Sequence, residues 1–181
     1  DDQAKPVRKT IFNSARNVVS SAPRQTHLSP NEPVAVIPAY RDAYFRPGVE
    51  DRVFALLDDL ADRTPFCDVV MTGHSFGAAL ATLAAARYAS SRPQIRVICD
   101  IMGSPRVGGV EFRHWVNSLP NLRIARLENA GDAWVNSPEG PNWSHVGHSF
   151  VMHDGKVLPY RFDYGRPTSG SKFLKAMTIT V

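Results

Sequence analysis

The chain has 181 residues, 43% of them hydrophobic, which is enough for one hydrophobic core and short for two domains. The formal net charge is only +4, and the 21 Lys and Arg residues are spread along the chain, which argues against a nucleic-acid partner. The same charge is compatible with transient contact with an anionic lipid surface. No apolar stretch approaches the roughly 20 residues of a membrane-spanning helix. The polar start DDQAKPVRKT has no apolar h-region of a secretion signal, and a signal peptide that has been removed stays an alternative. We therefore expect a soluble protein, either secreted or cytoplasmic.

The first 38 residues have prolines at positions 6, 23, 30, 33 and 38 and few periodic apolar residues, so they predict loops with at most one short strand. A helix is predicted after Pro47-Gly48, and it ends near Thr64-Pro65. Its expected apolar face consists of Val49, Val53, Leu56, Leu57 and Leu60.

The middle of the chain alternates between strands and helices. We predict strands at 68–72, 95–102 and 121–129, with helices at 76–90 and 109–118 between them. Strands and helices in alternation, with near-continuous apolar runs, indicate an α/β fold with a parallel sheet covered on both faces. The later segment HSFVMHDGKVLPY predicts a hairpin around Asp-Gly.

Cys67 and Cys99 lie at two predicted core strands, where two buried thiols are favoured over a disulfide. Neither cysteine has the spacing of a metal site.

Residues 69–89, VVMTGHSFGAALATLAAARYA, join a β-branched strand to an alanine-rich helix through Gly73-His-Ser75-Phe-Gly77. This order is the nucleophile elbow, in which a serine stands at the tip of a strained turn. Both glycines are expected to be needed because bulkier side chains would clash. The backbone N–H of Phe76 is expected to point at a developing oxyanion.

A serine hydroxyl needs an imidazole to take its proton and a carboxylate to orient that imidazole. Asp132 follows the predicted strand that ends near Glu128, at the edge where such sites form, and is the best acid. Among the histidines after it, His145 lies in a loop before the hairpin and is favoured as the base. His148 and His153 are the alternatives, as strand or turn residues.

Three blocks in this order resemble the class 3 lipases, the fungal triacylglycerol lipase-like α/β hydrolases: VVMTGHSFGAALATLAAA, IMGSPRVGGVEF, and RLENAGDAWV with WSHVG. The resemblance spans residues 39 to about 150. It implies an α/β-hydrolase-like, mostly parallel sheet flanked by helices, with Ser75, Asp132 and His145 as the triad. It also implies an acyl-enzyme route without metal or other cofactor.

The match weakens toward the N-terminus. The family's F-R-G-S/T strand supplies the second oxyanion donor, and its nearest match here is VRKT, with Thr10 as the donor and Lys9 in place of glycine. The family's two or three earlier strands have no match, so we expect an exposed sheet edge that a partner chain, another domain or a rearranged N-terminus covers. The region after Thr10 occupies the family's lid position, with Phe12, Val18 and Val19 as a candidate apolar face, although a Pro-rich surface loop fits equally well.

We expect one lipase-like domain over 1–181, made of an irregular oxyanion and lid-like region (1–38), a catalytic core (39–158) and a C-terminal extension (159–181). The favoured function is hydrolysis of carboxylic esters, such as acylglycerols or other lipid esters. The first alternative is an inactive lipase-like interaction domain, since the resemblance includes plant immune regulators that keep the fold for signalling. The second is lipid binding without turnover.

Overall fold

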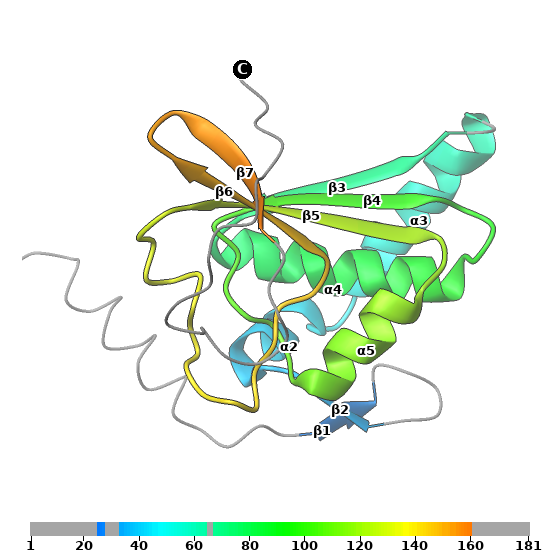
Figure 1. Cartoon of the computed structure of the whole chain (residues 1–181). Helices are drawn as coiled ribbons and strands as arrows, with labels where there is room; N and C mark the ends of the chain where they lie inside the picture. Colours follow the sequence, from blue (N-terminus) through cyan, green and yellow to red (C-terminus); the bar gives the residue numbers. More distant parts are fainter. Residues whose placement is uncertain (1–24, 28–32, 65–66, 161–181) are drawn as a thin grey trace, which may run out of the picture.

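The computed structural model describes residues 25–27, 33–64 and 67–160, and Figure 1 shows the arrangement of their helices and strands. In chain order these elements are β1 (Gln25–His27), β2 (Pro33–Ala35), α2 (Pro38–Tyr44), α3 (Val49–Arg63), β3 (Val69–His74), α4 (Phe76–Ser91), β4 (Val97–Met102), α5 (Val110–Ser118), β5 (Leu122–Asn129), β6 (His148–His153) and β7 (Lys156–Tyr160). The strands and helices predicted from residue 49 onward are all present, with small shifts at their ends.

The main sheet has the strand order β3-β4-β5-β6-β7, in which the first three pairs are parallel and the last is antiparallel. Gly73, Ile101, Arg126 and Ser149 lie at the same level across its first four strands. The carboxyl ends of β3, β4 and β5 therefore meet at one edge of the sheet, where α/β proteins form their sites.

The predicted Asp-Gly hairpin is confirmed as β6 and β7. Asp154 and Gly155 in its turn have φ values of 48° and 70°. A two-residue turn with both φ values positive matches the twist of the flanking strands, and Asp-Gly adopts it readily.

The described helices cover one face of the sheet. α4 packs across β3 and β4 through buried small side chains such as Ala78, Ala79 and Ala85, and α2 and α5 lie on the same side (Figure 1). On the other face Val70, Met102 and Met152 are 60%, 47% and 39% exposed. The expectation of a sheet covered on both faces is therefore wrong for the described part of the chain. The right-handed crossovers from β3 to β4 and from β4 to β5 advance in one direction, so both helices fall on one face.

The bounds predicted for α3 are confirmed, but its expected apolar face joins the core only in part, through Leu57. Leu56 and Leu60 on that face are 65% and 56% exposed. Part of the link to α4 is polar, since the Arg87 guanidinium donates to both carboxylate oxygens of Glu50 at 3.0 and 2.8 Å. Periodicity alone therefore identified the helix without identifying what its apolar face contacts.

The N-terminal part of the described chain is more ordered than predicted. β1 and β2 form an antiparallel pair where at most one strand was expected, and α2 begins at residue 38. The Ile37 N–H donates to the Val107 carbonyl at 3.0 Å, and the Gly109 N–H donates to the Ala35 carbonyl at 2.9 Å. These long-range bonds attach residues 35–37 to the loop after β4, and local sequence patterns contain no sign of them.

Both cysteines are free thiols, as the sequence favoured. Cys99 is buried in β4, and this burial raises the pKa of its thiol to about 12, whereas Cys67 is half-buried. Among the described residues, no helix is long and apolar enough to cross a membrane. The candidate lid face of Phe12, Val18 and Val19 and nearly all of the expected C-terminal extension lie outside the described residues.

Candidate active site

Ser75 stands on a sharp turn between β3 and α4. Its backbone has φ 54° and ψ −119°, an unusual conformation for a residue other than glycine. The Ser75 N–H donates to the Met102 carbonyl at 3.0 Å, and its own carbonyl accepts from the Ala78 N–H at 3.0 Å. The strained residue is thus held from both sides, and Ser75 is exposed to solvent at the carboxyl edge of the sheet.

The two glycines of the elbow have different roles. A Cβ on Gly73 would lie 2.4 Å from the carbonyl oxygen of Gly77 and 2.8 Å from the nitrogen of Ala78, both of them backbone atoms. A Cβ on Gly77 would meet no described atom within 4 Å. The steric need is therefore borne out for Gly73, and the same expectation for Gly77 is wrong because that position faces open space.

Phe76 is the first residue of α4, directly after Ser75. The first N–H groups of a helix have no acceptor within the helix and lie at the positive end of its dipole, so the Phe76 N–H is suited to an oxyanion. The Phe76 ring packs edge-to-face on Tyr40 of α2 with centroids 5.3 Å apart, while it stays 47% exposed. Thr10, the other predicted oxyanion donor, lies outside the described residues.

Asp132 lies just beyond β5, at the same edge as Ser75. Its Oδ1 accepts the Trp134 N–H at 2.9 Å, which orients the carboxylate. Its Oδ2 faces Gly103, which follows β4 with φ +54°; a Cβ added at Gly103 would lie 3.5 Å from Asp132 Oδ2 and 3.5 Å from His74 Nε2. The fold therefore gathers the predicted nucleophile and acid at the ends of β3, β4 and β5.

His145 has different surroundings. It precedes β6, which is separated from β3 by two strands, and its Nε2 atom is inaccessible to solvent. The pKa of its imidazole is lowered to about 2, first by burial and then by the charges of Arg126 and Arg106, against a hydrogen bond with the Val135 backbone that raises it. An imidazole so enclosed among cations is a weak proton acceptor. The structure thus holds His145 half-buried with its Nε2 shielded from solvent, whereas Ser75 is exposed.

His74 is a further imidazole that was not among the predicted site residues, because it lies inside the elbow motif. It is exposed, and its Nε2 lies on the same side of Gly103 as the Asp132 carboxylate. The alternation of side chains along a strand could have indicated that His74 is exposed, because it lies on the open face of β3 together with Val70 and Thr72. The glycine that permits the approach comes from another strand, so the proximity itself is a product of the tertiary fold.

A buried ion pair lies under β5. Arg126 and Glu128 are 2% and 4% exposed and face the helix layer, with the Arg126 guanidinium bonded to the Glu128 carboxylate. Burial lowers the pKa of Arg126 to about 10 in spite of the Glu128 charge. The pair was not predicted, because nothing in the strand sequence RLEN indicates that its two charges point inward.

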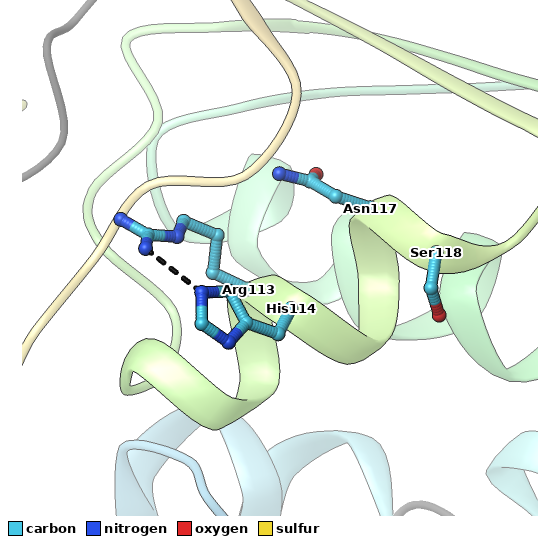
Figure 2. A pocket seen from close by; sticks show the side chains of 4 residues that line it. All are labelled: Arg113, His114, Asn117 and Ser118. Atoms are coloured by element: carbon cyan, nitrogen blue, oxygen red, sulfur yellow. Dashed lines mark hydrogen bonds between the residues drawn. The ribbon is translucent and has the colours of Figure 1, made fainter.

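Two surface hollows lie away from Ser75. One, of about 400 Å³, lies over α5 and is lined by Arg113, His114, Asn117 and Ser118 (Figure 2). The other, of about 460 Å³, lies near the amino ends of β4 and β5, beside Arg96 and Arg123. Within the described ranges, no group of three or more His, Cys, Asp or Glu residues is arranged to hold a metal ion.

Comparison with known proteins identifies the family of this chain. A family model described as lipase (class 3) matches residues 9–139. Phospholipase A1-II 1 of Oryza sativa is 39% identical over 105 residues, which are 55% of this chain and 25% of that protein. Phospholipase A1-IIdelta of Arabidopsis thaliana is 35% identical over 119 residues, which are 64% of this chain and 28% of that protein.

Solved lipases share the fold. A lipase from Rhizopus microsporus var. chinensis superposes with a TM-score of 0.68 at 22% identity, covering 78% of this chain and 49% of that one. A triacylglycerol lipase superposes with a TM-score of 0.67 at 24% identity, covering 78% of this chain and 54% of that one. The chain therefore spans about a quarter of the curated relatives and about half of the solved lipases. Because the family model covers most of the chain, including the elbow and the Asp132 loop, the protein belongs to the class 3 lipase family.

Proposed function

We propose that this protein hydrolyses carboxylic esters of lipids, with Ser75 as the nucleophile. The observation that carries the proposal is the strained, exposed serine at the carboxyl edge of the sheet, with the Asp132 carboxylate at the same edge. Membership of the class 3 lipase family supports the same chemistry. So does a structural neighbour, a triacylglycerol lipase whose catalytic centre is described as a serine protease triad.

In the proposed reaction, Ser75 Oγ attacks the ester carbonyl carbon while an imidazole takes the hydroxyl proton. The oxygen of the tetrahedral intermediate then carries the negative charge near the Phe76 N–H. The intermediate collapses by breaking the bond to the alcohol, which leaves with the proton from the imidazolium. Water then attacks the acyl-serine by the same steps, releasing a fatty acid and restoring Ser75.

For the imidazole, the sequence nominates His145, with Asp132 orienting it. The observed surroundings set a condition on that role, because the ring is enclosed beside Arg126 and Arg106. For His145 to act as the base, its Nε2, which is shielded from solvent, must come within hydrogen-bond reach of the Ser75 hydroxyl. His148 and His153 are exposed alternatives on β6, and Thr10 keeps its proposed role as the second oxyanion donor.

The substrate we propose is an acyl ester of a lipid, and two headgroup classes compete. The sequence resemblance favoured acylglycerols, whereas the curated relatives are named phospholipases A1. An inactive interaction domain is the rival from another class. It is motivated by the weak match at the oxyanion strand, since losing one oxyanion donor costs roughly 100- to 1,000-fold in rate.

The remaining proposals concern the context of this site. We propose that residues 1–181 form one domain and that it meets lipid surfaces transiently. β3 is an edge strand of the described sheet. We propose that a partner chain, another domain or the N-terminal region covers this edge.

The deciding experiment is labelling with a fluorescent fluorophosphonate, with Ser75→Ala and a heat-denatured sample as controls. Stoichiometric labelling that requires both Ser75 and the native fold is the expected result. His145→Gln, His148→Gln and His153→Gln then identify the base by which variant loses labelling. Release of fatty acid from phosphatidylcholine against triolein emulsions separates the headgroup classes. A well-folded protein that neither labels nor releases fatty acid would refute the enzyme and favour the interaction domain.

A further inference from the structure

The segment that carries Asp132 is a long connection between two parallel strands. Residues 130–147 run from the end of β5 to the start of β6 without a helix of their own. Such a connection has many accessible conformations unless hydrogen bonds to other elements restrict it. The orientation of the Asp132 carboxylate therefore depends on the contacts that hold this loop in place.

The start of this loop is held by a series of hydrogen bonds between residues close in sequence. The Asp132 N–H donates to the Asn129 carbonyl at 3.1 Å, and Asp132 Oδ1 accepts the Trp134 N–H at 2.9 Å. The Trp134 carbonyl in turn accepts the Ser137 N–H at 3.0 Å. The orientation of the carboxylate thus depends on where the residues around Ser137 are held.

Arg106, from the loop after β4, binds that point twice. Its backbone N–H donates to the Ser137 carbonyl at 2.8 Å, and its Nη1 donates to the Pro138 carbonyl at 2.8 Å. Pro138 is buried and Arg106 is half-buried, so solvent is a poor substitute for the guanidinium at this carbonyl. The clamp joins the loop to a segment that is itself bonded to residues 35–37 through Val107 and Gly109.

The same guanidinium also acts near the far end of the loop. Its charge contributes to the low pKa of His145, so Arg106 is close to both arms of the connection. Beyond Arg106, the Ser144 N–H donates to the Gly108 carbonyl at 2.9 Å. The short stretch from Arg106 to Gly108 therefore contacts the loop on both sides of its middle.

From these contacts we infer that Arg106 is a positioning residue: it clamps the turn at Ser137 and Pro138 and so fixes the orientation of the Asp132 carboxylate beside Gly103. The inference rests on the proposed function for its catalytic consequence. Arg106 itself touches no reacting atom; it acts through the loop. The side chain makes one of the two bonds, from Nη1 to the Pro138 carbonyl, and the backbone bond to Ser137 stays in every variant. A Lys ammonium can donate to the same carbonyl, whereas Met cannot.

The test compares Arg106→Met, Arg106→Lys and Arg63→Met in the 181-residue chain. Arg63 is the control because its side chain is 72% exposed and its Nη2 bonds Asp59 of the same helix, α3, at 2.7 Å. Amide hydrogen exchange reports the clamp directly, and the kinetics of p-nitrophenyl butyrate hydrolysis report its consequence. Urea unfolding of each variant confirms that it is folded.

For Arg106→Met we expect exchange of the Trp134 and Ser137 amides to accelerate by about tenfold or more, with α4 amides unchanged. We expect kcat to fall roughly tenfold to a hundredfold with KM nearly constant, because a displaced carboxylate misorients the catalytic groups. Arg106→Lys should recover part of both effects, and Arg63→Met should change neither.

Unchanged exchange at Trp134 and Ser137 in Arg106→Met would overturn the clamp. Faster exchange with unchanged kcat would overturn the positioning role. A wild-type chain that fails to react at Ser75 would count against the proposed function alone, because the exchange measurement still decides whether Arg106 holds the Asp132 loop. If Arg106→Met does not fold, Arg106→Lys carries both measurements, and its failure to change either would overturn the inference.

Discussion

Substitution of the two elbow glycines, Gly73 and Gly77, by alanine is expected to change the free energy of unfolding in opposite directions. In Gly73→Ala the new Cβ would lie 2.4 and 2.5 Å from the carbonyl oxygen and carbon of Gly77. Both are backbone atoms at the start of α4, so relief requires the helix to move relative to β3. In Gly77→Ala the new Cβ meets no described atom within 4 Å.

The magnitudes follow from these contacts. Forcing one carbon into a packed site costs about 1–3 kcal/mol, and contact with backbone belongs at the upper end, so we expect Gly73→Ala to lose about 2–3 kcal/mol of unfolding free energy. For a chain of this size this lowers Tm by roughly 4–12 °C. Gly77→Ala lies within a helix and should range from no change to about 1 kcal/mol of stabilisation, since alanine restricts the unfolded chain more than glycine.

The assay is urea unfolding followed by tryptophan fluorescence, with Ser75 labelling as a second readout. Gly73→Ala should shift the unfolding midpoint strongly and reduce labelling, because it displaces the turn that presents Ser75. Equal destabilisation by the two substitutions, or a Gly73→Ala loss below about 0.5 kcal/mol, would refute the reasoning, since ordinary surface substitutions fall in that range.

Two further predictions concern groups that the fold buries. The pKa of His145 is lowered to about 2 in the folded protein and is near 6.5 in the unfolded chain, so its contribution to stability is complete above pH 6.5 and is lost as pH falls. Between pH 7 and pH 5 the wild type should therefore lose up to about 2 kcal/mol of unfolding free energy that His145→Asn does not lose, as measured by urea unfolding. An equal dependence of the unfolding free energy on pH in the two proteins would show that the ring is accessible to protons. For the two thiols, Ellman's reagent should modify half-buried Cys67 in the native protein but Cys99 only after unfolding. The reason is that burial raises the pKa of the Cys99 thiol to about 12. Reaction of a native Cys67→Ser variant with the reagent would contradict this prediction.

The sequence by itself determined the parts of this protein that depend on local patterns. The β-branched run before Gly73, the alanine-rich run after Ser75 and the Asp-Gly pair at 154–155 each contain their own signal, and the structure has β3, α4 and the β6–β7 hairpin at those places. Asp132 belongs to the same group, since a residue just past a parallel strand must lie at the carboxyl edge. Family membership followed from the same local blocks.

Tertiary structure decided whatever depends on partners distant in the chain. The helices cover one face of the sheet because successive right-handed crossovers advance in one direction, a property of strand order that no single segment contains. His145 lies beside Arg126 and Arg106, and His74 lies beside Gly103 with Asp132, because different strands bring these residues together. Periodicity indicates which side chains share a face, but the identity of what that face meets is set only when the whole chain packs, and the chemistry of a histidine follows from that environment.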